Sequence, residues 1–463
     1  MIAHKCGIMG VCGRTSRALE MTYYGMLQLQ HRGQEGAGLV VHTPQGFRVW
    51  KDVGLLEYAI PERRLKEIEK SCAALGHVRY STVGAPTLEN IQPFVTEFRG
   101  EPLAIAHNGS LVNFDGVKQK LKKEGAIFHS STDTEIILHL IKQSGKRTPL
   151  KAIKYALERI EGSYSLLILT PHQLLAIRDP YGFRPLEYGK MMGIHLFASE
   201  SAPFDLLGVK QKRSVDRGKI IRVTEEGVEE IELGKRKEER FCLFELIYFA
   251  RSDSIVNDFN VASVRKEFGK LLARNAPADV DMVISVPDSS NITALSYAEA
   301  LGLPFGFGLV RNHYVGRSFI NPSLSATARD VRLKYNTIDA EVGGKRICVV
   351  DDSIVRGLTS KRLVDLLLEA GAKEVHLRIA SPPLRFPCFY GIDIPSSEEL
   401  IGAQFDDLAY NTRVERIRNY LGATSLAYIP LEEMLNVSYL KDRGFCTACF
   451  SGEYPIPVRG KVR

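Results

Sequence analysis

The feature that most constrains the fold is an alternation of apolar and helical segments in the second half of the chain. DMVISVP (281–287) and KRICVVDD (345–352) have the continuous apolar character of buried strands, and a helical segment follows each, SSNITALSYAEALG or TSKRLVDLLLEAGA. LPFGFGLV (303–310) and KEVHLRIAS (373–381) are predicted as further strands. Strands that alternate with helices build a parallel sheet. The sequence therefore predicts an α/β unit whose ligands bind where strands end and helices begin.

The first half has a different pattern. Short β-type segments such as GLVVHT and YSLLILT are separated by Gly, Pro and Asn, and two helical segments, TYYGMLQLQH and DTEIILHLIKQSG, interrupt them. This pattern predicts an α+β unit. The chain of 463 residues is too long for one ordinary core. We expect the polar segment ELGKRKEERF to mark the boundary, with one domain over 6–235, a second over 236–430 and a C-terminal segment over 431–463.

Composition excludes several classes of protein. A net charge of +7 is modest, and the aromatic residues do not interleave with basic ones as a nucleic-acid platform requires, so no nucleic-acid partner is expected. The longest apolar stretches are too short to span a bilayer, and MIAHK has no apolar core of a signal peptide, so we expect a cytoplasmic protein without membrane contact. Eight cysteines in such a chain indicate burial, catalysis or metal binding rather than a disulfide framework.

The segment ICVVDDSIVRGLTSKRL carries the clearest chemical signal in the second half. Its strand ends in Asp351 and Asp352, and a short loop leads to a helix whose first N–H groups favour an anion. A capped helix behind a strand with a chance acidic pair is the alternative. Two acids at the end of an apolar strand are costly unless they bind something, which favours a ligand site.

This segment resembles the signature of the type I phosphoribosyltransferases, which bind phosphoribosyl pyrophosphate (PRPP) and Mg²⁺. The resemblance implies that Asp351 and Asp352 bind the ribose hydroxyls and, with Ser289, hold one Mg²⁺ per subunit. VISVPDSS matches the pyrophosphate loop with Asp288 and Ser289. Leu358 stands where many relatives have threonine. The 5′-phosphate would bind to Arg356, Gly357, Leu358, Thr359 and Ser360.

A basic segment between these two motifs resembles the loop that closes over PRPP in that family. Closure would exclude water, and basic side chains would neutralise the leaving pyrophosphate. An ordinary solvated loop is the alternative. The candidate contacts to pyrophosphate are Arg311, Arg317, Arg332 and Lys334.

The chain begins MIAHKCG, and Cys6 allows two interpretations. It is either a cysteine packed in the first strand or, if residues 1–5 are removed as a leader, an N-terminal nucleophile with its own α-amine as base. LQHRGQEGAG, GHVRYSTVGA, AHNGSLVN and SSTDTE follow it in order.

Together these motifs resemble the class II glutamine amidotransferases, which are N-terminal-nucleophile hydrolases with a four-layer αββα sandwich. The resemblance implies that Cys6 attacks the glutamine carboxamide, and that Asn108 and the Gly109 N–H form the oxyanion hole. Arg79 would bind the α-carboxylate of glutamine, and Asp133 its ammonium group.

The two halves in this order resemble the glutamine PRPP amidotransferases, which open purine synthesis. The family reaction takes glutamine and PRPP and gives 5-phosphoribosylamine, glutamate and pyrophosphate, with ammonia passing through an internal apolar tunnel. Residues of LFELIYFARSDS are candidates for its lining. The resemblance also implies a homotetramer and feedback inhibition by nucleotides such as AMP and GMP. Glucosamine-6-phosphate synthases and asparagine synthetases share the first half, but VVDDSIVRGLTS speaks against both. A PRPP-sensing regulator without chemistry is the alternative from another class.

Four cysteines have contexts that resemble the ligands of a [4Fe–4S] cluster in one branch of this family, the branch that also carries a removable leader. Four thiolates are the expected set for one such cluster per subunit, and a Cys₄ zinc site is the physical competitor. Cys12, Cys72 and Cys348 match no ligand position and are expected to be packed. The four candidate ligands are Cys242, Cys388, Cys446 and Cys449.

Overall fold

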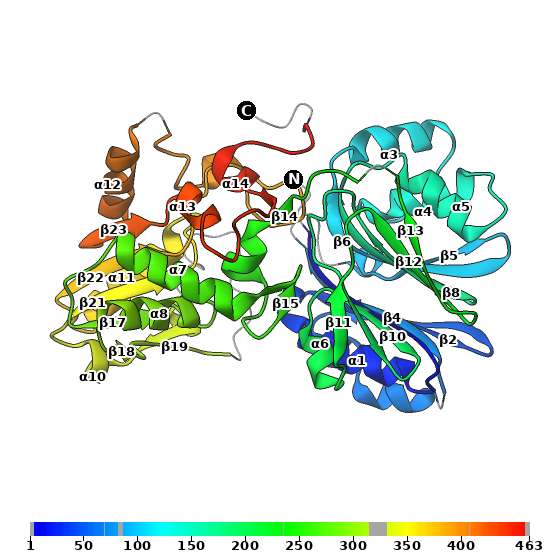
Figure 1. Cartoon of the computed structure of the whole chain (residues 1–463), viewed down its shortest axis with the longest axis horizontal. Helices are drawn as coiled ribbons and strands as arrows, with labels where there is room; N and C mark the ends of the chain where they lie inside the picture. Colours follow the sequence, from blue (N-terminus) through cyan, green and yellow to red (C-terminus); the bar gives the residue numbers. More distant parts are fainter. Residues whose placement is uncertain are drawn as a thin grey trace.

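The first half of the chain forms two antiparallel sheets that pack face to face (Figure 1). The computed structural model describes residues 4–68, 70–81, 87–234, 236–313, 331–406 and 408–458. Within these ranges one sheet has seven strands, in the order β11-β9-β10-β1-β4-β2-β3, and the other has six, in the order β13-β12-β8-β7-β6-β5. The strands are β1 (His4–Gly13), β2 (Gly36–Thr43), β3 (Gly46–Val53), β4 (Ala73–Ser81), β5 (Phe94–Phe98), β6 (Glu101–Leu111), β7 (Gly162–Thr170), β8 (Gln173–Arg178), β9 (Glu187–Met191), β10 (Ile194–Ala198), β11 (Gln211–Ser214), β12 (Lys219–Thr224) and β13 (Val228–Glu232).

Helices cover the outer face of each sheet, so that the half has four layers. Three separate apolar clusters mark the layer boundaries: one beneath α1, one between the sheets around Ile8 and Leu167, and one beneath α4. This confirms the predicted αββα sandwich. The helices over the seven-stranded sheet are α1 (Ala18–Gln28), α2 (Leu56–Ala59) and α6 (Ala202–Leu206), and those over the six-stranded sheet are α3 (Phe114–Lys123), α4 (Thr134–Gln143) and α5 (Pro149–Leu157).

The second half is built on a parallel sheet with helices on both faces. The strand order is β18-β17-β21-β22-β23, and all its pairs are parallel. Along β17 and β21, Val283 and Val350 pack with α7 and α8, while Ile284 and Val349 pack with α11 and α12. The α/β prediction is therefore confirmed. The elements are α7 (Val261–Asn275), β17 (Met282–Ser285), α8 (Asn291–Leu301), β18 (Phe305–Gly306), β21 (Arg346–Asp351), α11 (Leu358–Glu369), β22 (Glu374–Ile379), α12 (Tyr410–Leu421) and β23 (Ser425–Tyr428).

Two sequence predictions are wrong. LPFGFGLV is not one strand: β18 joins the parallel sheet, and β19 (Leu309–Arg311) pairs with β20 (Tyr335–Thr337). The break falls at Gly308, where a Cβ would stand 2.8 Å from Val342 and 2.9 Å from Ile284, so only glycine fits this close approach. Cys72 is exposed rather than packed, while Cys12 and Cys348 are buried as expected.

The halves meet along several short elements near the middle of Figure 1. Among the described residues of 233–240 there is no helix or strand. No helix within the described ranges is long and apolar enough to cross a membrane. The remaining elements are η1 (Gln30–Arg32), η2 (Glu62–Glu67), η3 (Leu88–Asn90), β14 (Phe241–Cys242), the π-helical turn η4 (Glu245–Phe249), β15 (Ile255–Val256), β16 (Phe259–Asn260), α10 (Asp339–Val342), η6 (Ser397–Glu399), α13 (Leu431–Leu435), β24 (Phe445–Cys446) and α14 (Ala448–Ser451).

Candidate active sites

Cys6 lies in β1 and faces the layer between the two sheets. It pairs with Arg79 of β4, and directly opposed residues of antiparallel strands project from the same face. Only 1% of Cys6 is exposed. Burial raises the pKa of its thiol to about 11, although the charge of Arg79 acts in the opposite direction. The group is therefore a neutral thiol near pH 7 and needs a base before it can act as a nucleophile.

Asn108 and Gly109 lie on β6 in the facing sheet. Ser199, directly after β10, links the two sheets here: its hydroxyl accepts the Ile8 N–H at 3.0 Å and the Asn108 side-chain N–H at 3.5 Å. Asn108 is fully buried, and its Oδ1 has no hydrogen-bond partner among the described residues. Because Ile8 is two residues from Cys6 on the same face of β1, this contact places Asn108 opposite the Cys6 region.

Arg79 has the arrangement expected of a carboxylate-binding group. It is 2% exposed, and its Nη1 donates to the Asn90 carbonyl oxygen. Its Nε and Nη2 are buried and have no hydrogen-bond partner in the part of the chain that the structure describes. These two groups form one edge of the guanidinium, the edge that binds a carboxylate with two parallel hydrogen bonds. An unpaired buried donor is costly, which favours a ligand at this edge.

Asp133 precedes α4 and lies at the far end of the same layer. Its Oδ2 accepts the Leu111 N–H at 2.8 Å, and its Oδ1 is 3.7 Å from Nδ1 of His107. Burial lowers the pKa of His107, so its ring is neutral near pH 7. Asp133 is thus a buried carboxylate at the end of β6, the strand that carries Asn108.

The sequence analysis did not assign Arg32, which contacts the predicted nucleophile. Its Nε donates to the Cys6 carbonyl oxygen at 3.1 Å. Gly33 after it lies against β4, where a Cβ would stand 2.5 Å from the Val78 carbonyl carbon, so glycine lets η1 approach the strand. The motif HRG was visible in the sequence, but the contact with Cys6 depends on the packing of η1.

A cavity of about 1000 Å³ opens at the carboxyl ends of β17 and β21. It is also lined by His31 of the first half and by η4 residues Tyr248 and Phe249. Its lining includes most of the residues predicted for PRPP and Mg²⁺: Asp288, Ser289, Arg311, Lys334, Asp351, Asp352, Arg356, Gly357, Leu358, Thr359 and Ser360.

Asp351 and Asp352 lie buried at one end of this cavity. The Ser289 hydroxyl donates to Asp352 at 2.5 Å, and the Ser290 hydroxyl donates to Asp351 at 3.4 Å. Burial raises the pKa of both carboxyls, and the charge of Asp352 raises that of Asp351 further. Two adjacent carboxyls whose ionisation is disfavoured by burial are suited to a divalent cation, which favours their charged forms.

The loop before α11 has the geometry of an anion site. Gly357 has φ 79° and ψ −19°, a left-handed conformation that favours glycine, and a Cβ there would stand 2.7 Å from Ile401. Thr359 and Ser360 follow in the first turn of α11, where backbone N–H groups are unpaired. Arg356 pairs with Glu399 at 2.7 Å.

Only some of the basic residues predicted to contact pyrophosphate line the cavity. Arg311 lines it and pairs with Asp288 at 2.9 Å, and Lys334 lines it as well. Arg332 does not line it: its guanidinium pairs with Glu369 of α11 at 2.7 Å. Arg317 lies outside the described residues.

The four candidate cluster cysteines are buried or half-buried where the halves meet. β14 and β24 are parallel, and Cys242 is in register with Cys446. Cys388 Sγ accepts the N–H groups of Tyr390 and Ile392 at 3.4 Å. Over the described ranges, no group of three or more His, Cys, Asp or Glu side chains is arranged so that it could hold a metal ion.

Arg184 is a buried cation next to these thiols. Its Nη2 pairs with Glu245, but its Nε and Nη1 have no hydrogen-bond partner among the described residues. Burial raises the pKa of Cys242 to about 12, and the charge of Arg184 opposes this shift for both Cys242 and Cys388. Arg184 thus favours thiolates at this position.

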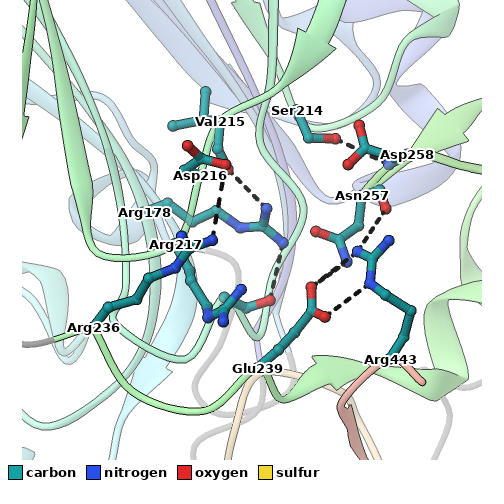
Figure 2. A pocket seen from close by; sticks show the side chains of 11 residues that line it. Arg178, Ser214, Val215, Asp216, Arg217, Arg236, Glu239, Asn257, Asp258 and Arg443 are labelled. Carbon is teal, nitrogen blue, oxygen red and sulfur yellow. Dashed lines mark hydrogen bonds and ion pairs between the residues drawn. The ribbon is translucent and has the colours of Figure 1, made fainter.

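A second cavity, about 220 Å³, lies where the halves meet and is lined mainly by charged groups (Figure 2). Arg443 pairs with Glu239 at 2.9 Å. Arg178 donates to the carbonyl oxygens of Arg184, Val215 and Gly182. The Arg443–Glu239 pair joins the segment before β14 to the C-terminal region, and Arg178 holds the loops of the first half that line the same cavity.

The chain was compared with known proteins. A family model described as a glutamine amidotransferase domain matches residues 77–205. The amidophosphoribosyltransferase of Bacillus subtilis is 42% identical over 98% of this chain and 94% of its own length. Amidophosphoribosyltransferase 1, chloroplastic, of Arabidopsis thaliana is 43% identical over 99% of this chain and 80% of its own. The solved structure of glutamine PRPP amidotransferase from B. subtilis, complexed with ADP and GMP, matches with a TM-score of 0.90 and 41% identity over 99% of both chains.

The fold and the match define the class: a glutamine amidotransferase domain joined to a phosphoribosyltransferase domain with a parallel sheet. Relatives more than 40% identical over nearly the whole chain define the family. The chain belongs to the amidophosphoribosyltransferase family.

Proposed function

We propose that the chain is a glutamine-dependent amidophosphoribosyltransferase that catalyses the first step of purine nucleotide synthesis. Glutamine is hydrolysed at Cys6, and its nitrogen replaces pyrophosphate on PRPP in the 1000 Å³ cavity. The products are 5-phosphoribosylamine, glutamate and pyrophosphate. One observation carries the proposal: the cavity that holds Asp351 and Asp352 extends to His31, whose neighbour Arg32 contacts the backbone of Cys6.

The first half-reaction uses the groups around Cys6. Its sulfur attacks the carboxamide carbon, and the carbonyl oxygen gains charge against the Asn108 amide and the Gly109 N–H. The C–N bond breaks with a proton transferred to nitrogen, and water then hydrolyses the thioester to glutamate. The free edge of Arg79 binds the α-carboxylate of glutamine, and Asp133 binds its ammonium group.

The base in this scheme is the α-amine of Cys6, which requires removal of residues 1–5. While Lys5 is attached, the Cys6 nitrogen is an amide and cannot accept a proton. A free α-amine has a pKa near ~8 and can transfer the proton from the thiol. We therefore propose that the leader is removed on maturation.

The second half-reaction takes place at the strand ends. Displacement at ribose C1 develops positive charge on the ring, while pyrophosphate leaves with added negative charge. Asp351 and Asp352 bind the ribose hydroxyls, the loop from Arg356 to Ser360 holds the 5′-phosphate, and Arg311 and Lys334 face the pyrophosphate. Ser289, Asp351 and Asp352 would hold Mg²⁺, because their oxygens fit that ion and because a cation would favour the charged forms of the two carboxyls, whose pKa values burial raises. When bound, Mg²⁺ neutralises charge on the leaving group.

We also propose a [4Fe–4S] cluster held by Cys242, Cys388, Cys446 and Cys449, with a structural or oxygen-sensing role. The donor chemistry supports it: four thiols, two N–H groups directed at Cys388 Sγ, and the buried guanidinium of Arg184, whose Nε and Nη1 have no hydrogen-bond partner among the described residues and favour a negatively charged group. Protein purified without oxygen should be brown and contain about four irons per chain. A colourless preparation that contains zinc would contradict the cluster.

Several finer properties complete the proposal. Nucleotides such as AMP and GMP are expected feedback inhibitors, and the solved relative bound to ADP and GMP supports a nucleotide site. We also expect a homotetramer in the cytoplasm, with the domain boundaries given above.

The test of the function is glutamate release in the presence of PRPP, together with the formation of pyrophosphate. Turnover of both substrates in equal amounts is expected. Binding of PRPP without any turnover would favour the alternative, a regulator that retains the fold without the chemistry.

A further inference from the structure

The π-helical turn η4 lies between the two candidate active sites. π-helical turns are rare and often occur at functional positions. Glu245 at the start of η4 is fully buried, while Tyr248 and Phe249 line the large cavity. The turn belongs to the second half by sequence, yet its first side chain contacts the first half.

Glu245 is held between two buried arginines of the first half. Its Oε1 lies 2.7 Å from Nη2 of Arg32 and also pairs with Arg184, and its Oε2 accepts from Nη1 of Arg32 at 3.2 Å. The Arg32 guanidinium lies 4.4 Å above the ring of Phe249. Since Nε of Arg32 donates to the Cys6 carbonyl, Glu245 fixes the group that contacts the nucleophile's backbone.

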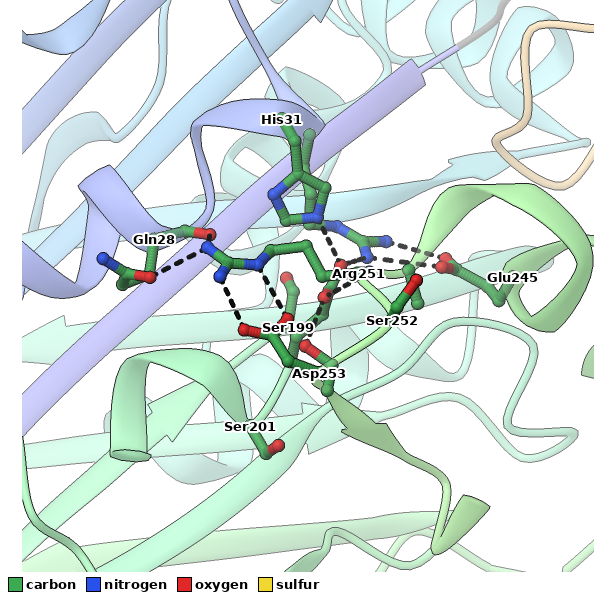
Figure 3. Close-up of polar contacts among 12 residues, drawn as sticks. Gln28, His31, Ser199, Ser201, Glu245, Arg251, Ser252 and Asp253 are labelled. Atoms are coloured by element: carbon green, nitrogen blue, oxygen red, sulfur yellow. Dashed lines mark hydrogen bonds and ion pairs between the residues drawn. The ribbon is translucent and has the colours of Figure 1, made fainter. Parts of the chain in front are cut away.

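Glu200 completes the charge balance around Arg32. Figure 3 labels His31 and Glu245, two other members of this group of polar contacts. Its Oε1 pairs with Arg32 and accepts from His31 at 2.7 Å, and its Oε2 accepts the Ser254 hydroxyl at 2.7 Å. Burial alone would raise the pKa of Glu200, but His31 and Arg32 hold it well below its usual value. Two buried carboxylates therefore orient one guanidinium.

The other end of η4 is attached to the phosphoribosyl cavity through Arg265 of α7. Its Nε donates to the Leu246 carbonyl at 2.9 Å, and its Nη2 donates to the Ala250 carbonyl at 2.8 Å. Its Nη1 lies 3.4 Å from the Ser289 carbonyl, and the Ser289 hydroxyl binds Asp352. A continuous set of hydrogen bonds thus runs from Asp352 through η4 to Cys6.

We propose that Glu245 is a positioning residue for glutamine hydrolysis: through Arg32 it holds the backbone of Cys6, so that the second half of the chain completes the glutamine site. The inference rests on the proposed role of Cys6. Glu245 is absent from the cavity lining, and among the described residues its side chain bonds to Arg32 and Arg184 rather than to the residues assigned to glutamine binding. Misplacement of a reacting group by about 1 Å can cost about 10²-fold in rate.

The test is Glu245→Gln, which keeps the shape of the side chain and removes its charge. Arg32 then keeps only Glu200 as a carboxylate partner. We expect kcat for glutamine hydrolysis to fall at least ~30-fold, because the nucleophile loses its orientation. KM for glutamine should stay within about 2-fold, since Arg79 and Asp133 are unchanged, and ammonia-dependent turnover should also stay within about 2-fold.

The matched control is Glu239→Gln. Glu239 is a partly buried carboxylate where the two halves meet. It pairs with Arg443 in the second cavity instead of with Arg32. We expect both activities of this variant to match those of the unmodified enzyme. Equal loss of glutamine-dependent activity in the two variants would overturn the inference.

A second variant covers the case in which Glu245→Gln does not fold. Arg32→Lys keeps a cation between Glu200 and Glu245 but loses the Nε–H bound to Cys6, and the same selective fall in kcat is expected. Normal glutamine kcat in both folded variants, or a parallel loss of ammonia-dependent turnover, would contradict the positioning role. Cys6→Ala in the same assay separates the two claims: if it still hydrolyses glutamine, the proposed function fails, whatever Glu245 does.

Discussion

The two candidate sites differ in how the chain assembles them. The glutamine site lies between two sheets, and its residues come from β1, β4, β6 and the start of α4, with Cys6 and Asn108 almost fully buried. The phosphoribosyl site is a cavity of about 1000 Å³ at the ends of neighbouring parallel strands. The first is an enclosed site that depends on long-range packing. The second is an open site at which most residues come from short loops that follow two neighbouring strands of the sheet, β17 and β21.

This comparison predicts that the sites can be inactivated separately. The largest expected effect is that of Cys6→Ala, which removes the nucleophile. Glutamine-dependent turnover should fall by at least about 10³-fold, while turnover with high ammonium should be unchanged. Both rates are measured as pyrophosphate release. Loss of the ammonia-dependent rate as well would mean that Cys6 has another role.

Asp352→Asn should have the opposite selectivity, because the cavity serves both nitrogen sources. We expect a fall of about 10²-fold with glutamine and with ammonia alike, since one charge is lost where a cation and the ribose bind. Initial rates with each nitrogen source check this. Unchanged ammonia-dependent turnover would contradict the assignment of the acidic pair.

Arg79→Lys should affect substrate binding in the enclosed site alone. A lysine cannot make the two parallel hydrogen bonds of the free guanidinium edge, so KM for glutamine should rise about 10–100-fold. Ammonia-dependent turnover is the internal control and should not change. A normal KM for glutamine would show that Arg79 does not bind the substrate.

The smallest expected effect concerns the packing between the two halves, away from both candidate sites. Glu187 of β9 is buried and accepts the Asn257 N–H at 2.9 Å and the Ser214 hydroxyl at 2.7 Å. Burial raises the pKa of its carboxyl to about 7. The folded protein therefore holds this proton more tightly than the unfolded chain, and stability falls as pH rises from about 4.5 to about 7.

Glu187→Gln removes that titration. At pH 8 the free energy of unfolding of the variant should exceed that of the unmodified protein by roughly 1–3 kcal/mol, so its Tm should be higher. At pH 5 no such difference in Tm is expected. Thermal unfolding at the two pH values checks this. An equal Tm difference at both would exclude Glu187 as the titrating group.

The same contrast explains what the sequence could predict. Asp351, Asp352 and the loop to Ser360 are consecutive in the chain, so a strand followed by a helix already places them together at a sheet edge. The parallel sheet followed from apolar periodicity in the same way, whereas the pattern of the first half predicted only an α+β unit and its αββα layers were implied by the resemblance to the glutamine amidotransferases. The division of LPFGFGLV depended instead on how closely Gly308 packs against Val342 and Ile284.

The missed residues depend on contacts between distant parts of the chain. Arg32 meets Glu200 and Glu245, which lie 168 and 213 residues away, and nothing local in HRG or FELIYF indicates that pairing. Arg332 was predicted near pyrophosphate because its basic segment resembles the loop that closes over PRPP, but its guanidinium pairs with Glu369 of α11 instead. Charge and motif predicted which side chains could take part in a site. Long-range packing decided which of them lie at the site.

The central claim is that nitrogen released at the enclosed site reaches the open cavity inside the protein. The most direct measurement supplies glutamine labelled with ¹⁵N at the amide, together with PRPP and an excess of unlabelled ammonium at a pH where free ammonia reacts slowly. The account predicts 5-phosphoribosylamine that carries the label almost undiluted. Product labelled only in proportion to the ammonia mixed in solution would contradict it.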